Sequence, residues 1–341
     1  MPNAQIDASG LLILPRLQVQ NANAISGPLT WGFPSPTAFT GFAHALERRL
    51  LAGAPYDFGD LREGFGGVGI ICHRFEPQIS RPAGRRTRVF NLTRNPVGKD
   101  GIPTALVEEG RAHLEVTLLI VVKDYFGPGN SEEFAKTAHR LAQGMRLAGG
   151  SILPARSGQR YQARWEVLSD YLDGEGGQRE LFATLRRRLL PGNALIQRED
   201  LLAERLTALR ETQPNATALD ALLDLSRLNT EPVGPDPAQP NTDAVLWEVR
   251  KRPGWLVPLP CGYAGISPLY SPGEVENARD GVTPFRFVEC LYSLGQWISP
   301  HRLEHLQQLL WYHTADPENG IYRCVNHYSE FKTLSALDSI A

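Results

Sequence analysis

The chain has 341 residues, 42% of them hydrophobic, which is long enough for two domains or for one domain with large insertions. Its formal net charge of −2 excludes a protein that is basic over its whole surface, although a local basic patch stays possible. The longest apolar run, residues 118–122, is far too short to span a membrane, and no secretory signal pattern is present, so we expect a cytoplasmic protein without membrane association.

Residues 11–20 alternate between apolar and polar side chains, which predicts a half-buried β-strand. Leu11, Ile13, Leu17 and Val19 share one parity and are expected to form its buried face. Pro15 has no backbone N–H to donate to a neighbouring strand, so we expect an edge position or a bulge there.

A helix is predicted to begin at Pro36 with Ser35 as its N-cap, because a serine hydroxyl can accept a free N–H and proline loses nothing at the first helical position. Free N–H groups and the helix dipole at this end favour an anion such as a phosphate. The alternative is a well-capped polar connection without a ligand. The candidate binding residues between the strand and the first helical turn are Asn21, Asn23, Trp31, Gly32, Ser35 and Thr37.

Residues 64–69, GFGGVG, satisfy the pattern G-x-G-x-x-G. A dinucleotide site is excluded because that pattern must follow a strand and open a helix, whereas here a helix precedes it and the strand 68–75 follows. We expect these glycines to form a flexible lead-in to the strand.

A basic arm is predicted over residues 76–110, since 77–99 contain no acidic residue and are punctuated by prolines and glycines. Eight basic and four acidic residues give the segment 73–111 a net charge of +4. A solvated loop without a partner is the alternative. The candidate nucleic-acid-binding residues here are Arg74, Arg81, Arg85, Arg86, Arg88 and Arg94.

A second alternating strand is predicted over 112–122, followed by a helix with Ser131 as its N-cap and acidic residues in its first turn. We expect this helix to end in the sequence RLAGG, with Gly149 just past its end and Gly150 allowing a ligand to approach the backbone closely. Residues 151–153 are expected to form a short strand, and Arg146 is a further candidate contact.

The first 154 residues therefore read strand, helix, strand, arm, strand, helix, strand. This order predicts an α+β, ferredoxin-like domain with the basic arm inserted in its sheet. The RNA-recognition motif has the same layout, but no RNP1-like aromatic run is present. Beyond it we expect a helical insertion at 155–231, a proline-rich linker at 232–243, and a smaller mixed, β-rich C-terminal subdomain at 244–341.

Within these later segments, Thr217 and Asp220 have the spacing of a capping box. A closing helix is expected to open at Ser299–Pro300 and to bury Leu303, Leu306 and Leu310.

The sequence lacks the motifs of phosphoryl transfer, zinc-dependent hydrolysis and acyl transfer, and no cofactor is expected. Its four isolated cysteines predict neither disulfides nor a zinc site. His73 and His113 lie on adjacent predicted strands and could together cleave RNA by acid–base catalysis. Two half-buried structural histidines are the alternative.

Five stretches resemble the family of second Csy subunits of type I-F CRISPR surveillance complexes, in the branch of the RAMP superfamily that caps the 5′ end of crRNA. They occur in the family's order and lie at residues 14–42, 73–96, 146–154, 254–263 and 272–289. The linker and the last twenty residues match the family poorly.

This resemblance implies a non-catalytic scaffold subunit that holds the crRNA 5′ handle together with the large Csy subunit, beside the adjacent backbone subunit and possibly target DNA. It assigns handle contacts to the loop before the first helix, a thumb-like role to the basic arm, and backbone contacts to Gly149 and Gly150. Two alternatives stay open: a metal-independent endoribonuclease that processes precursor crRNA on the same fold, and a protein-interaction module whose arm binds an acidic partner.

Overall fold

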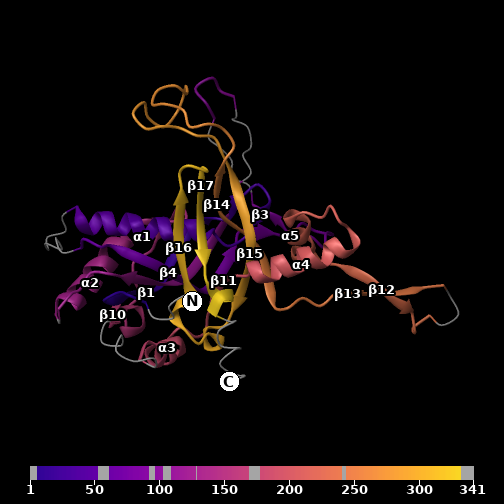
Figure 1. Ribbon diagram of the computed structural model, residues 1–341, viewed down its shortest axis with the longest axis horizontal. Helices are drawn as coiled ribbons and strands as arrows, with labels where there is room; N and C mark the ends of the chain where they lie inside the picture. Colours follow the sequence, from indigo (N-terminus) through magenta and orange to yellow (C-terminus); the bar gives the residue numbers. More distant parts are fainter. Residues whose placement is uncertain are drawn as a thin grey trace.

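The computed structural model describes residues 6–52, 61–91, 97–102, 109–127, 129–168, 177–239 and 243–331. It is an α+β structure built on one antiparallel sheet of eleven strands, as expected for the fold class in its broad form. Helices α1 and α2 lie together on one side of Figure 1, and α3 lies below them.

The N-terminal part contributes a run of neighbouring strands in the order β4, β7, β1, β9, β8. All of these pairings are antiparallel. The elements are β1 (Gly10–Asn23), α1 (Pro36–Leu51), β4 (Phe65–Pro77), β7 (Arg111–Val122), α2 (Asn130–Gln143), β8 (Arg146–Leu147) and β9 (Gly150–Ile152).

A bulge in β1 corrects the expected burial pattern of this strand. Pro15 and Arg16 together oppose Thr117 alone, so the expected bulge at Pro15 is confirmed. Because the extra residue reverses the faces of a strand, Leu17 packs in the same core as Leu12 and Leu14. Leu11 and Ile13 point to the other face, into a core with α3. We call the two sides of the sheet the α1–α2 face and the α3 face.

Both faces of the sheet are covered over much of β1 and β7, which is why the predicted alternation of buried and exposed residues is lost there. Residues 114–122 of β7 are all buried, with Leu118 and Ile120 in one core and Leu119 in the other. The glycines before strand 68–75 do not form a flexible lead-in, because β4 already begins at Phe65. A Cβ on Gly67 would lie 2.7 Å from the Tyr312 ring, so this glycine provides packing space.

The two long helices of this part begin differently. Ser35 caps α1 as predicted, and its Oγ accepts a hydrogen bond from the Thr37 backbone N–H at 3.2 Å. The prediction for Ser131 was wrong: the N-cap of α2 is Gly129, at φ +89°, and Ser131 lies buried inside the helix.

The sequence RLAGGSI forms a tight hairpin and not a helix end, which corrects a second expectation. Helix α2 ends at the cap residue Gly144, and β8 and β9 pair across the turn residues Ala148 and Gly149. Both turn residues have positive φ, 49° and 76°, the conformation that a two-residue hairpin turn requires.

The C-terminal half of the chain adds its strands to the same sheet. The expected helical insertion contains helices but also two strands, β10 and β11, which pair with β1 and with β4 and β15. The division into domains stays a prediction. The further elements are β10 (Arg164–Val167), α3 (Gly177–Arg188), β11 (Asn193–Gln197), α4 (Glu199–Thr212), α5 (Ala218–Ser226), β14 (Trp255–Gly265), β15 (Val288–Ile298), β16 (Leu310–Asp316) and β17 (Ile321–Asn326).

Strand pairing closes part of the sheet into a ring. The order β11, β15, β14, β17, β16, β4 returns to its start because β11 also pairs with β4. Trp311 is fully buried, and its Nε1–H donates to the Leu195 carbonyl at 2.8 Å. Closure leaves β4 without a free edge over the paired residues, which removes a template for aggregation.

Where a closing helix was expected after Ser299, the structure has two short 3-10 turns, Pro300–Arg302 and Leu306–Leu309. Strand β16 follows directly. Leu303, Leu306 and Leu310 are nevertheless buried, as predicted. The apolar residues were therefore assigned correctly to the core, and only the backbone conformation that brings them there was wrong.

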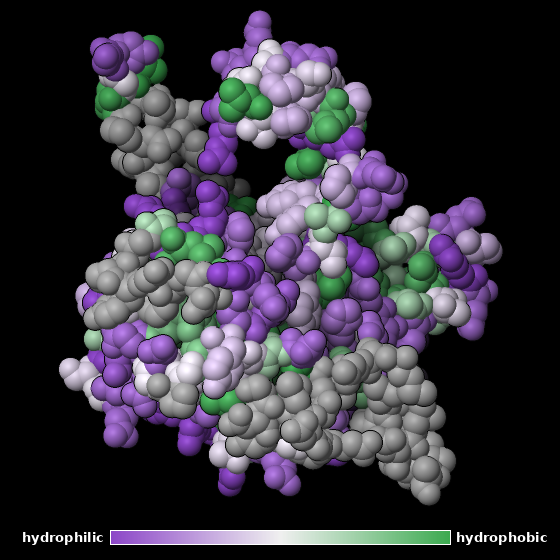
Figure 2. All heavy atoms as spheres, turned by 60° about the vertical axis from the view of Figure 1, so that its left-hand side comes forward, coloured by the Kyte–Doolittle hydropathy of each residue, from purple (hydrophilic) through white to green (hydrophobic). Residues whose placement is uncertain are grey.

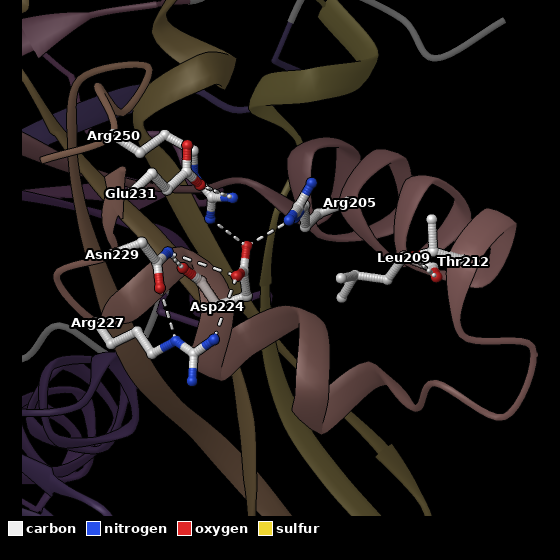
Figure 3. Close-up of polar contacts among 8 residues, drawn as sticks. All are labelled: Arg205, Leu209, Thr212, Asp224, Arg227, Asn229, Glu231 and Arg250. Carbon is white, nitrogen blue, oxygen red and sulfur yellow. Dashed lines mark hydrogen bonds and ion pairs between the residues drawn. The ribbon is translucent and has the colours of Figure 1, made fainter. Parts of the chain in front are cut away.

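A β-hairpin extends away from the sheet at the right of Figure 1. Its strands are β12 (Thr230–Pro235) and β13 (Val245–Val249), so the first part of the expected linker pairs with a strand. Figure 3 shows how its base is held: Asp224 of α5 binds Arg250 and Arg205, each at 2.6 Å. The capping box of Thr217 and Asp220 that begins α5 is confirmed.

Candidate nucleic-acid interface

The loop between β1 and α1 contacts the two other predicted binding segments, the basic arm and the turn between β8 and β9. It contains a small hairpin of its own, β2 (Ile25–Gly27) and β3 (Thr30–Trp31). Its Trp31 ring stacks on Phe90 of the basic arm, with ring centroids 3.4 Å apart. On its other side, the Asn23 backbone N–H donates to the Ala148 carbonyl in the β8–β9 turn at 2.8 Å.

The asparagines of this loop are exposed, but each is also used by the fold. Asn21 has a positive φ of 59°, and its side-chain oxygen accepts a hydrogen bond from Gln78 at 2.6 Å. The Asn23 side chain bonds both backbone groups of Ile25, which fixes the turn. Their remaining hydrogen-bonding capacity faces solvent, so contacts to a ligand are compatible with these structural roles.

Ser35 and the N–H groups beside it are occupied by protein partners, which corrects the expectation of a free anion site. The Ser35 hydroxyl, on a residue only 7% exposed, donates to the Pro260 carbonyl at 2.8 Å. Pro36 has no N–H, and the Thr37 and Ala38 N–H groups bond to Ser35. The helix dipole still favours negative charge at this end. Gly32, at φ +145°, faces open space.

A groove of about 470 Å³ lies at the N-terminal end of α1. We call it the α1 groove; its lining includes Asn23, Ser35, Thr37, Ala148, Tyr263 and Tyr322. The two tyrosines come from β14 and β17, more than two hundred residues beyond the loop, and the Tyr263 side chain is 43% exposed. Sequence reasoning named neither as a candidate, although Tyr263 ends one of the family-like stretches, residues 254–263.

The basic arm carries four exposed arginines, Arg81, Arg85, Arg86 and Arg88. A pair of short strands, β5 (Ile79–Ser80) and β6 (Val89–Phe90), forms its base. The Arg81 side chain bonds within the turn, through Nε to the Arg85 carbonyl at 2.9 Å. Arg94 lies outside the described residues. In Figure 1 the arm rises at the top of the molecule, where the connection between β14 and β15 also projects.

Arg74 is not part of this group. It lies on β4, forms an exposed ion pair with Glu76 at 2.5 Å, and lines a small groove with His113 and Arg156. That groove crosses β1 and β7 beside Gln18 and Gln20, on the α3 face of the sheet. Arg74 is therefore expected to contact a different part of any ligand than the arm does.

The two glycines of the β8–β9 hairpin have opposite surroundings. Gly149 is exposed, with open space around it, whereas Gly150 is buried and a Cβ there would lie 2.7 Å from backbone atoms of Gln20 and Ala22. The close approach at Gly150 is thus to β1 and not to a ligand. Arg146 is exposed, and its guanidinium donates to the Gly149 carbonyl at 3.4 Å within the same hairpin, so its role as a ligand contact stays a prediction.

His73 and His113 are on adjacent strands, as expected, but they do not meet. His113 pairs with Glu76, while both ring nitrogens of His73 are bonded, to the Pro191 carbonyl at 2.6 Å and the Thr117 hydroxyl at 2.8 Å. His113 and Thr117 are four residues apart on β7, roughly 13 Å. Burial lowers the pKa of His73, so this ring is neutral at pH 7.

The other titratable groups in the described part of the chain are scattered or buried. No cluster of three or more His, Cys, Asp or Glu side chains there could hold a metal ion. The cysteines are free thiols, and burial raises the pKa of Cys72 and Cys261 to about 12. None of the described helices is long and apolar enough to cross a membrane. The face in Figure 2 is mainly hydrophilic, with hydrophobic residues in small patches.

Comparison with known proteins gives a consistent result. The family model described as "CRISPR-associated protein (Cas_Csy2)" matches residues 12–324. The chain is 55% identical to the CRISPR-associated protein Csy2 of Pseudomonas aeruginosa (strain UCBPP-PA14) over 321 residues, which cover 93% of this chain and 95% of that protein. The match includes the β1–α1 loop, the basic arm, and both tyrosines of the α1 groove.

Proposed function

The chain belongs to the Csy2 family of CRISPR-associated proteins, and from this we propose that it is a non-catalytic crRNA-binding subunit of a type I-F surveillance complex. Its role there is to hold the 5′ handle of the crRNA together with the large Csy subunit, in the cytoplasm, for interference with foreign DNA. The adjacent backbone subunit of the crRNA filament is a further partner, and target DNA passes close to the assembly.

The fold of the N-terminal part supports this proposal. We infer that residues 10–152 form the ferredoxin-like unit of a RAMP protein, because the strand order β4, β7, β1, β9 and the helices after β1 and β7 are those of a split βαβ arrangement. The basic arm leaves this unit between its second and third strands. Both helices pack on one face of the sheet, so loops at the sheet ends are available for RNA.

The observation that carries the proposal is the contact between Trp31 and Phe90. It fixes the arm, with its four exposed arginines, beside the loop that leads to the α1 groove. Arginines supply contacts to phosphates, and Tyr263 offers an exposed ring on which a base can stack. Phe90 covers one ring face of Trp31, so in this proposal the main role of Trp31 is to position the arm.

Replacing Arg85 and Arg86 by alanine should weaken crRNA binding and reduce its salt dependence. Each phosphate of a single-stranded RNA that the protein neutralises contributes about −0.7 to the slope of log affinity against log salt. Losing two such contacts should therefore flatten the slope by roughly 1.4. The loss should be similar for all RNA sequences, because phosphate contacts do not read bases. The measurement is a titration of labelled repeat RNA at several salt concentrations.

The matched control is Lys136→Ala with Arg187→Ala, which removes two exposed positive charges from α2 and α3, away from the arm. It should leave the slope unchanged. If the Arg85 and Arg86 double variant keeps the wild-type slope but no longer co-purifies with the large subunit, the arm is a docking element for an acidic protein and the assignment to RNA is wrong.

A non-catalytic role is expected because the two histidines that could act on RNA are separated. Incubation with labelled repeat RNA in the presence of EDTA should leave the RNA intact over hours. Cleavage at a single site under these conditions, abolished by His113→Ala, would instead establish the endoribonuclease alternative, since a metal-independent mechanism needs an acid–base group at the bond.

The proposed protein partners are supported by exposed apolar side chains on the C-terminal half. Trp247 is 60% exposed and Trp255 62% exposed, and Val282 reaches 82% in the projection between β14 and β15. Apolar and aromatic residues of this kind are enriched where another chain covers the surface.

A further inference from the structure

A further groove, of about 400 Å³, lies on the α3 face of the sheet, where β1 and β7 meet the start of β10, the turn before it and the end of α3. We call it the Arg16 groove. Its polar lining consists of Arg16, Thr117, Gln159, Arg160, Arg164 and Arg188. Ile13, Leu185 and Leu189 form an apolar floor. None of the four arginines was a candidate from the sequence, because they come from four separate segments.

Arg16 reaches this groove because of the bulge in β1. The residue has a positive φ of 49°, and its backbone N–H donates to the Thr117 hydroxyl at 3.0 Å. Bulges commonly redirect a side chain at functional sites. Here the bulge places the Arg16 guanidinium on the α3 face beside Glu115, whose carboxylate it contacts through Nη1 at 2.6 Å.

The second terminal nitrogen of Arg16 is unusual. The side chain is only 9% exposed, and Nη2 is buried without a hydrogen-bond partner among the described residues. Leaving a buried charged donor unsatisfied is costly, and guanidinium groups present paired donors suited to a phosphate or carboxylate. Arg16, which lines the groove, therefore carries a donor without an acceptor among the described residues.

The charges around the groove also favour an anion. Two of the four arginines have a carboxylate partner within the described part of the chain, Arg16 with Glu115 and Arg188 with Glu166 at 3.2 Å. Arg164 donates to the Gln159 carbonyl, and Arg160 is exposed. His73, which bonds Thr117, stays neutral: burial lowers its pKa, and the charges of Arg16 and Arg160 lower it further. The balance of described charges is two positive charges in excess.

We propose that the Arg16 groove binds a phosphate group, supplied by the backbone of a single-stranded RNA that crosses the α3 face of the sheet. An arginine-rimmed groove with an apolar floor fits a nucleotide, whose phosphate meets the guanidinium groups while its sugar and base cover Ile13 and the leucines. Gln18 and Gln20, with Arg74 and Arg156, line the smaller polar groove further along β1, so polar side chains continue from the Arg16 groove towards the base of the arm.

The proposal that the phosphate belongs to an RNA depends on the proposed RNA-binding function. The proposal that the groove binds phosphate does not depend on it. Arg16 and Asn23 are seven residues apart on β1, roughly 23 Å, so this site is separate from the α1 groove. Substitutions in the two places should therefore have additive effects on RNA affinity.

The test uses the full chain and the double variant Arg160→Gln with Arg164→Gln, which removes two charges and leaves Arg16 and Glu115 paired. Its control is Lys136→Gln with Arg187→Gln, two exposed cations that do not line the groove. In the first experiment, inorganic phosphate should raise the thermal unfolding midpoint of the wild type and of the control. The affinity of the groove variant for phosphate should be about tenfold lower. An equal response of all three proteins would show that binding is unspecific and would overturn the proposal.

In the second experiment, labelled single-stranded RNA is cross-linked to the protein by ultraviolet light, with a mononucleotide as competitor. Cross-links in the peptide around Tyr161 that the groove variant loses would support an RNA backbone.

If phosphate affinity falls in the variant while RNA cross-links and the salt slope stay unchanged, the ligand is a free nucleotide and RNA as the source is wrong. If both affinities are unchanged but a co-purified protein is lost, the groove binds an acidic protein. If the basic arm does not bind RNA, the result of the phosphate experiment is unaffected. The two proposals can therefore fail independently.

Discussion

Replacing Gly150 by valine should unfold the β8–β9 region and destabilise the protein by about 3 kcal/mol, the upper end of the usual range for overpacking. The Cβ alone would lie 2.7 Å from the Ala22 nitrogen and from the Gln20 carbonyl oxygen of β1, and neither backbone atom can move without breaking the pairing of β1 with β9. Valine adds two more carbon atoms at the same place. The measurement is the midpoint of denaturant unfolding followed by circular dichroism.

Gly149→Asn is the matched control, one residue away in the same hairpin. Gly149 has φ +76° with no atom near its Cβ position, and asparagine tolerates this conformation better than other residues with a side chain. Its cost should stay below about 1 kcal/mol. A Gly150→Val protein of normal stability that merely loses RNA would show that this glycine serves a ligand, as the sequence alone suggests, and that the packing argument fails.

Replacing Asp224 by alanine should release the β12–β13 hairpin from the body of the protein. The Asp224 side chain is 9% exposed and binds Arg205 and Arg250 at 2.6 Å, with Arg227 at 3.7 Å on its other oxygen (Figure 3). Breaking a buried pair costs about 3–5 kcal/mol, but these arginines are partly exposed, so we expect about 2 kcal/mol. Hydrogen exchange over residues 199–250 should rise while the sheet stays protected.

Glu231→Ala tests whether the effect belongs to the buried carboxylate. Glu231 binds Arg250 at 3.2 Å, but its side chain is 53% exposed, so its removal should cost less than about 1 kcal/mol. Equal exchange rates in the two variants would mean that Arg250 needs any one acidic partner and that Asp224 holds no special position. Unchanged exchange in both would contradict the anchoring role.

The same carboxylate makes the attachment of the hairpin depend on pH. Burial acts to raise the pKa of Asp224, but the hydrogen bonds and charges of Arg205 and Arg250 outweigh it and hold the pKa below its ordinary value of 3.8. A group whose pKa is lowered by folding stabilises the protein above the unfolded pKa, and this stability is lost as pH falls through the folded pKa. Protection of the hairpin should therefore persist at pH 5 and be lost progressively as the pH falls below about 4, whereas Asp224→Ala should lack that step.

Local patterns in the sequence identified much of the N-terminal part, because they depend on nearby residues only. Ser35 and Pro36 located the start of α1, and the spacing of Thr217 and Asp220 located the start of α5. The order of strands and helices predicted an α+β fold, and the quoted stretches predicted the family. The missing N–H of Pro15 predicted an edge position or a bulge, and the structure has the bulge.

Tertiary structure decided the points that depend on distant partners. The sequence is equally compatible with Gly150 as a ligand contact and as a packing site. The positions of Gln20 and Ala22 in the fold show that it is a packing site. Residues 299–310 have the apolar spacing of a helix, yet they form two 3-10 turns that lead into β16, since that strand closes the ring with β4. Propensity is a weak preference that such long-range pairing overrides.

The candidate binding surfaces divide in the same way. The sequence by itself determined that a basic arm and a polar loop exist, because charge and capping are local properties. Only the tertiary structure brought Tyr263 and Tyr322 to the α1 groove and gathered Arg16, Arg160, Arg164 and Arg188 around one cavity. A one-residue bulge decides which face of β1 carries Arg16, and its effect on the parity of the strand becomes visible only when both strands are paired.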